Sequence, residues 1–163
     1  MTDEFANRLN DFTASELFSR SFREGMDLVE EAAAYLDGPG REESRALPRD
    51  GALAYAGESM RLTTRLMQVA SWLLVQRAVR EKEMSIEDAC DDKYRLGSDK
   101  IRKADLDNKQ TPATLKDLIA RTDKVFDRIS RLDAQIYGEK GRKEQTNVVS
   151  DQHAALSAAF AKK

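Results

Sequence analysis

The sequence has few of the side chains that catalysis, metal binding or crosslinking require. Its 163 residues include one cysteine, Cys90, and one histidine, His153. A single cysteine excludes an intramolecular disulfide and is usual in a reducing compartment. A zinc site needs about four clustered ligands, and a Cys–His nucleophile would require His153, near the C-terminus, to reach Cys90. We therefore expect no enzyme, no metal site and no cofactor.

Long apolar runs are missing as well. The longest, residues 69–75, is interrupted by Ser71 and is much shorter than the roughly 20 residues that a membrane span needs. Residues 1–12 lack the basic region and following apolar core that mark a secretory signal. We expect a soluble, cytoplasmic protein without a membrane partner.

A basic excess, which duplex-DNA binders usually have because they neutralise phosphates, is also absent. The formal net charge is −2. Residues 86–103 have the outline of a helix-turn-helix, with a short helix, a glycine turn and a basic second segment. Asp105 and Asp107 interrupt that second segment, and it has too few apolar residues to seat a recognition helix. We expect no nucleic-acid partner and keep a helical regulatory DNA-binding module only as an alternative.

Helix-forming residues in long amphipathic patterns dominate the chain, with three prolines and no alternating strand pattern. The longest pattern, residues 53–82, carries two adjacent apolar rows that together span about 160° of the helix. The rows are Met60, Thr63, Met67, Ala70 and Leu74, and Leu62, Leu66, Val69 and Leu73. This width exceeds what one partner helix can bury, so we expect a central helix with another helix on each row.

An earlier helix is expected to begin at Thr13, a capping residue, and to end at Gly38-Pro39-Gly40. Gly25 lies within its apolar stripe. A glycine there costs about 1 kcal/mol relative to alanine, so close approach of another helix is expected at this point.

Two more helices are expected in the second half of the chain. Ser85 caps a short one, SIEDACDDKYRL. The last long helix has Thr111 as its cap and Pro112 at its first position, and Gly138 ends it.

These patterns predict an all-α fold. Three long amphipathic helices joined by modest loops are typical of an antiparallel three-helix bundle, here with a long central helix, a short extra helix and a disordered C-terminal tail. We expect residues 1–12 to be a frayed N-terminus, residues 13–138 to form the helical bundle domain and residues 139–163 to form a flexible tail.

One polar row of the central helix is the candidate protein-interaction site. It lies opposite the apolar rows and contains Glu58, Arg61, Arg65, Gln68 and Trp72. Tryptophan and arginine are enriched at interface hot spots, and they stack favourably when a guanidinium lies over an indole. A partner protein or a second copy in a homodimer would cover this row. In the other interpretation, the bundle covers Trp72 and the arginines pair with Glu58 and other carboxylates.

Residues 53–85, LAYAGESMRLTTRLMQVASWLLVQRAVREKEMS, and the upstream LVEEAAAYLDGPGRE of residues 28–42 resemble the RcdA family of bacterial cell-cycle proteins. The similarity is carried by a long stretch rather than by a short motif, and it extends over about residues 15–137. The resemblance implies a three-helix bundle that can dimerise.

The resemblance also implies a function, which is that of a non-enzymatic adaptor for the AAA+ protease ClpXP. In that family a response-regulator-like protein, CpdR, primes the protease, and the RcdA-type adaptor then delivers substrates. A cyclic-di-GMP-binding adaptor, PopA, attaches to it for delivery of the cell-cycle transcription factor CtrA. The alternatives from the residues alone are the DNA-binding module and a purely structural dimerisation module.

Overall fold

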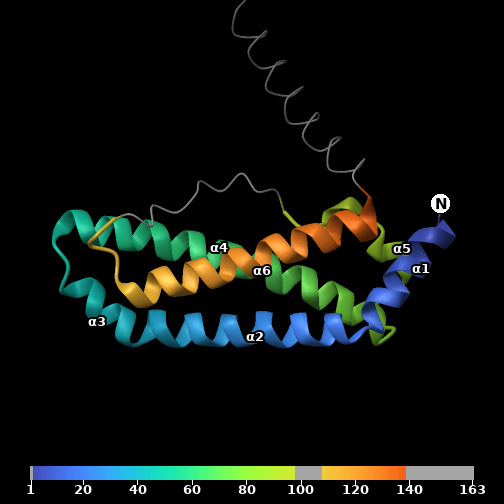
Figure 1. Ribbon diagram of the computed structural model, residues 1–163, viewed down its shortest axis with the longest axis horizontal. Coiled ribbons are helices and arrows are strands. Elements are labelled where there is room, and N and C mark those ends of the chain that lie inside the picture. The colour runs from blue at the N-terminus through green and yellow to red at the C-terminus, as the bar shows by residue number, and fades with distance from the viewer. Residues whose placement is uncertain (1, 98–107, 139–163) are drawn as a thin grey trace, which may run out of the picture.

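Three long helices lie side by side along the molecule and form its body (Figure 1). The computed structural model describes residues 2–97 and 108–138. The long helices are α2 (Glu16–Asp37), α4 (Arg49–Arg80) and α6 (Ala113–Tyr137). The described ranges contain helices and turns but no strand. The predicted all-α bundle is confirmed, whereas the predicted tail at 139–163 lies outside the described residues.

The long helices do not simply alternate in direction. Contacts between α4 and α6 advance together along both helices, from Arg65 at Phe126 to Gln76 at Tyr137. These two helices therefore run parallel, and only α2 is antiparallel to them (Figure 1). Helix α6 accordingly begins near the start of α4, where Gln110, shortly before α6, lies against Gly51.

The expectation of a frayed N-terminus is wrong. Residues Thr2–Thr13 form helix α1, which covers one end of the bundle (Figure 1). Its Phe5, Leu9 and Phe12 are all buried. The Phe12 ring packs against the Trp72 indole, with ring centroids 5.7 Å apart. Burial of three large side chains, each stabilising by about 1.5–3 kcal/mol, explains why this segment is ordered.

The ends of the helices follow the predicted capping chemistry with small shifts. The cap of α2 is Ser15 rather than Thr13, and its hydroxyl accepts the Phe18 N–H at 3.2 Å. Gly38 ends α2, but Pro39–Arg45 at once begin a further short helix, α3. Pro112, rather than Thr111, is the N-cap of α6, so this helix begins at Ala113, one residue later than predicted.

The short helix after α4 is smaller than predicted. It consists of α5 (Ile86–Ala89) and a 3₁₀ turn, η1 (Asp92–Tyr94). The predicted cap is confirmed, because Ser85 Oγ accepts the Asp88 N–H at 3.0 Å. The predicted terminator of α6 is also confirmed, since Gly138 adopts a φ of 85° that side chains rarely tolerate.

The predicted close approach at Gly25 is confirmed. A Cβ atom added to Gly25 would lie 2.6 Å from Leu73 Cδ1 and 3.5 Å from Val69 Cγ1 of α4. One of the two predicted apolar rows of α4 forms this contact with α2, and its members are all buried: Leu62, Leu66, Val69 and Leu73. Within the described ranges, no helix has the length and apolar character needed to cross a bilayer.

Two glycines test this account of the packing. Gly57 is exposed in the middle of α4, and a Cβ there would meet nothing within 4 Å. Gly57→Ala should raise the free energy of unfolding by about 0.5–1 kcal/mol, because alanine forms helix more readily. Gly25→Ala should lower it by about 1–3 kcal/mol, because buried Leu73 must move. Urea denaturation measures both, and an equal gain for the two variants would contradict the close approach.

Candidate protein-interaction surface

The polar row predicted as the interaction site lies mostly within the bundle. Glu58 is buried and forms an ion pair with Arg61. Arg65 lies with its guanidinium carbon 3.9 Å from the centre of the Phe126 ring of α6. Gln68 is half-buried, and its side chain packs against Gly97. The arrangement matches the second interpretation from the sequence, in which the bundle covers this row.

Trp72 is the most buried member of the row, with 2% of its surface exposed. Its indole N–H donates to Asp133 Oδ1 of α6 at 3.0 Å. The expectation that a second chain or a client protein must cover Trp72 is therefore wrong. The physical reason is that α6 supplies a carboxylate for the indole N–H and an aromatic ring for Arg65, so this polar side of α4 packs against α6.

The surface that α4 leaves uncovered is the apolar row predicted to be buried. Leu53 is 66% exposed, Met60 71%, Met67 64% and Leu74 49%. These four side chains recur every seven residues, which keeps them on one face over about 32 Å of helix. We refer to Leu53, Met60, Met67 and Leu74 as the α4 stripe. Uncovered apolar side chains that line up in this way mark contact surfaces more often than scattered ones do.

The α4 stripe has an internal symmetry. Its four large residues lie at equal distances on either side of the Thr63–Thr64 bond, with Leu53 matching Leu74 and Met60 matching Met67. Small residues occupy the positions between them in the same mirror order. Those residues are Ala56 with Ser71, Gly57 with Ala70, and Thr63 with Thr64. When two copies of such a face cross antiparallel about a two-fold axis, residues of similar size lie opposite each other.

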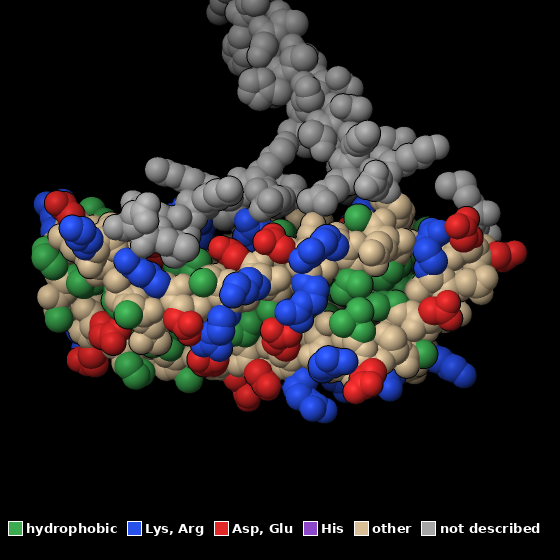
Figure 2. All heavy atoms as spheres, viewed as in Figure 1, with side chains coloured by type: hydrophobic (Ala, Val, Ile, Leu, Met, Phe, Trp, Pro, Cys, Tyr) green, Lys and Arg blue, Asp and Glu red, His purple; other side chains and the backbone are tan. Residues whose placement is uncertain are grey.

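The outer surfaces of α2 and α6 have a different character. Acidic and basic side chains are interspersed over this face of the molecule (Figure 2). Arg121 Nη1 donates to Glu31 at 2.8 Å and Arg128 to Glu24 at 2.6 Å, which joins α6 to α2 across the surface. The hydrogen bonds from Arg121 lower the pKa of the Glu31 carboxyl. These are solvated ion pairs, and on the described long helices the large hydrophobic side chains that are exposed are the α4 stripe and Leu17 of α2.

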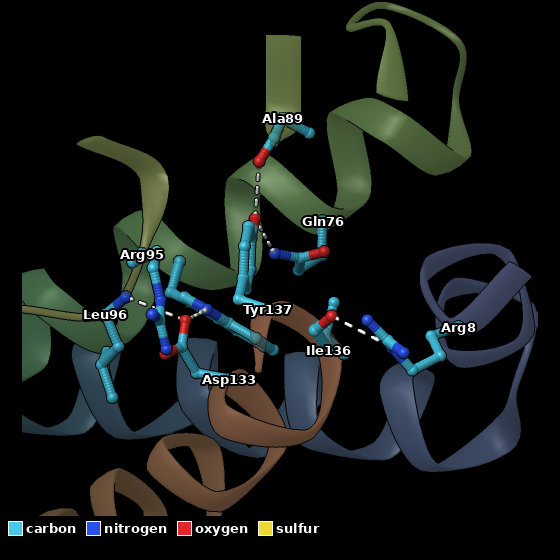
Figure 3. A network of polar contacts seen from close by, with 9 residues as sticks. Arg8, Gln76, Ala89, Arg95, Leu96, Asp133, Ile136 and Tyr137 are labelled. Atoms are coloured by element: carbon cyan, nitrogen blue, oxygen red, sulfur yellow. Dashed lines mark hydrogen bonds and ion pairs between the residues drawn. The ribbon is translucent and has the colours of Figure 1, made fainter. Parts of the chain in front are cut away.

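A buried polar network fixes the loop that follows α5 next to the α4 stripe (Figure 3). The Arg95 guanidinium donates to Asp133 Oδ2 from Nη2 at 2.9 Å and from Nε at 3.3 Å. The Leu96 backbone N–H donates to Asp133 Oδ1 at 3.1 Å, the oxygen that also accepts from Trp72. One carboxylate of α6 thereby ties both α4 and the loop to the bundle.

A second set of bonds secures the beginning of that loop (Figure 3). The Tyr137 hydroxyl donates to the Ala89 carbonyl at 2.8 Å and lies 3.5 Å from Gln76 Nε2. Burial raises the pKa of Tyr137 to about 12, so the hydroxyl remains a donor at neutral pH. Helix α1 also contacts the end of α6, because Arg8 Nε donates to the Ile136 carbonyl at 3.2 Å.

Sequence reasoning missed Arg95 and Asp133. A signal for Asp133 was present, because it falls four residues after Ile129 and three before Ile136, in the buried periodicity of α6. An acidic residue at a core position needs a buried hydrogen-bond donor. The single tryptophan of the sequence, Trp72, carries such a donor on its indole nitrogen. No comparable sequence signal exists for Arg95, which lies in the loop after η1.

Asp133→Asn tests the network. The substitution leaves the Arg95 guanidinium buried without its counter-charge, so we expect the free energy of unfolding to fall by about 3–5 kcal/mol. Glu24→Gln is the matched control, because it breaks a pair whose side chains are both about half exposed and should cost less than about 1 kcal/mol. Similar losses in urea denaturation of the two variants would show that the Asp133 network is not a main source of stability.

Comparison with known proteins places this architecture in a family. A family model described as a protein of unknown function (DUF1465) matches residues 9–160. The crystal structure of RcdA from Caulobacter crescentus CB15 is similar at 53% sequence identity and a TM-score of 0.65. The alignment covers 79% of this chain and 98% of that one. No curated protein matches the chain. The family model and the similarity to RcdA agree with the resemblance found in the sequence, and the chain belongs to the RcdA family.

Proposed function

We propose that this chain is a cytoplasmic, non-enzymatic adaptor that delivers substrates to the AAA+ protease ClpXP. Membership of the RcdA family supports the proposal, and the α4 stripe is the observation that carries it. An adaptor needs a rigid body and an uncovered face on which other proteins dock. The bundle provides the body through its buried network, and the stripe provides the face.

The α4 stripe fits a partner helix. Its heptad spacing matches the seam along which two helices pack with their side chains interlocked. The small residues between its large ones allow close approach, and methionine adapts to partners of different shape. The proposed partners are the protease primed by a response-regulator-like protein such as CpdR, a cyclic-di-GMP-binding adaptor such as PopA, and substrates such as CtrA.

A second copy of the chain is a further proposed partner for the same face. If two α4 helices cross antiparallel at the Thr63–Thr64 bond, Met60 of one copy lies beside Met67 of the other. Leu53 then lies beside Leu74 at both ends. Met60 then contacts Met67 of the other copy and Met67 contacts its Met60, which is the reciprocal pairing of a two-fold interface.

A reconstituted degradation assay tests the adaptor function. Adding the chain to primed ClpXP should accelerate substrate degradation, whereas the chain alone should degrade nothing. Met60→Glu with Met67→Glu should reduce that acceleration by about tenfold, which corresponds to roughly 1.4 kcal/mol of lost contact. The melting temperature of this double variant should equal that of the unmodified chain, because both methionine side chains are exposed.

The matched control for this assay is Leu17→Glu, which places the same charge on an exposed leucine of α2, away from the stripe. Leu17→Glu should accelerate degradation as the unmodified chain does. Full acceleration by the Met60 and Met67 variant would remove the stripe as the docking face. No acceleration by the unmodified chain would remove the adaptor function itself.

Charge placement tests the antiparallel dimer. Met60→Glu with Met67→Glu brings like charges together across the axis and should yield monomers. Met60→Glu with Met67→Lys brings opposite charges together in an antiparallel pair, but like charges in a parallel pair. Light scattering after size exclusion should therefore show a dimer for the second variant and a monomer for the first. The reverse result, or no dimer of the unmodified chain at high concentration, would contradict this arrangement.

A further inference from the structure

A groove of about 340 Å³ runs beside the α4 stripe, between the second half of α4 and the loop after η1. Met67, Gln68 and Val75 line it from the helix. The opposite wall is formed by Lys93 and Tyr94 of η1 and by Arg95 and Gly97, which follow it. Trp72, at its base, is held by Asp133.

The wall contributed by the loop is held firmly in place. Arg95 donates two hydrogen bonds to Asp133, and the neighbouring Leu96 N–H donates a third. At Gly97 the backbone approaches α4 so closely that a Cβ would lie 2.6 Å from Gln68 Nε2. The groove is therefore a preformed feature of the bundle and needs no ordering step before it binds.

The polar groups of the groove are suited to an anion. Two charged residues line it, Lys93 and Arg95, and both are cationic; no acidic residue of the described part of the chain does so. Arg95 is only 8% exposed and Asp133 holds its guanidinium, so Lys93 is the accessible cation of the groove. Lys93 approaches Asp91 at 3.9 Å, but both side chains are more than half exposed, so water screens this pair.

The apolar groups of the groove suit a large aliphatic side chain. Met67 is exposed and flexible, whereas Val75 and Tyr94 are half-buried.

We propose that this groove binds an extended peptide segment of a partner protein in which an acidic residue adjoins a large aliphatic one. The aliphatic side chain lies against Met67, Val75 and Tyr94. The carboxylate accepts a hydrogen bond from the exposed Lys93 ammonium, a charge-assisted bond that is stronger than a neutral one. The proposal goes beyond the adaptor function, because it assigns a sequence preference to a second site and is measured on this chain alone.

The test uses labelled peptides and fluorescence polarisation with the full chain. A glycine-serine peptide carrying Leu-Glu should bind, and Leu-Gln and Ala-Glu versions should bind about tenfold more weakly, because each loses one of the two contacts. Binding of the Leu-Glu peptide should also weaken as the salt concentration rises. Equal binding of the three peptides, or binding of none, would overturn the proposal.

Variants that leave Met67 intact separate the groove from the α4 stripe. Ser71→Trp, which fills the groove from α4, should abolish peptide binding, and Lys93→Glu should weaken it about tenfold. Lys124→Glu makes the same charge change at an exposed position of α6 that does not line the groove, and should leave binding unchanged. Equal effects of Lys93→Glu and Lys124→Glu would show that net charge, and not the groove, is responsible.

The single tryptophan gives a direct readout. Peptide binding should shift the NMR signal of the Trp72 indole N–H, which lies at the base of the groove, and a bound peptide that leaves this signal unmoved occupies another site. A failed peptide test together with accelerated degradation by primed ClpXP would overturn the groove alone. Peptide binding without accelerated degradation would overturn the adaptor function alone.

Discussion

The buried carboxylate of Asp133 determines how the other parts of the molecule are arranged. It accepts hydrogen bonds from the Trp72 indole, the Arg95 guanidinium and the Leu96 backbone. A charge in a bundle core is tolerated only when its partners compensate for lost hydration. Those three partners come from α4 and from the loop after α5, so a single side chain of α6 fixes the positions of both.

This contact also decides which face of α4 remains outside. Each helix of a three-helix bundle has two neighbours, and the rest of its surface faces solvent. The apolar row centred on Leu66 and Val69 packs on α2, and the polar row from Glu58 to Trp72 packs on α6. Within residues 2–97 and 108–138, no further helix covers the α4 stripe. On α2 and α6 the outer faces instead carry ion pairs such as Arg121 with Glu31.

The sequence was sufficient for the fold class because that depends on local patterns. Helical periodicity, the capping of α5 by Ser85 and the close approach at Gly25 all depend on residue spacing, and the structure confirms each. Helix α1 was also within reach, because Phe5, Leu9 and Phe12 lie at the spacing of a single helix face.

The outward face of α4 could not be predicted in the same way. Ranked by hydrophobicity alone, Met60 and Met67 belong inside and Arg65 and Gln68 outside. The polar row is buried instead because Phe126 and Asp133, far along the chain, stabilise it. The Phe126 ring packs against Arg65, and the Asp133 carboxylate accepts a hydrogen bond from Trp72. Periodicity within one helix carries no information about such partners, so the candidate site was predicted wrongly while the all-α fold class was predicted correctly.

This division of roles bears on how the chain can interact. The residues that hold the bundle together lie on the α2 and α6 sides of α4, and the side chains of the α4 stripe take no part in those contacts. Their removal therefore costs the bundle little, whereas their presence leaves about 32 Å of aligned apolar surface in water. A stable bundle has no need of such a surface, but a partner helix or a second copy gains hydrophobic stabilisation by covering it. The stripe is thus better explained by binding than by folding.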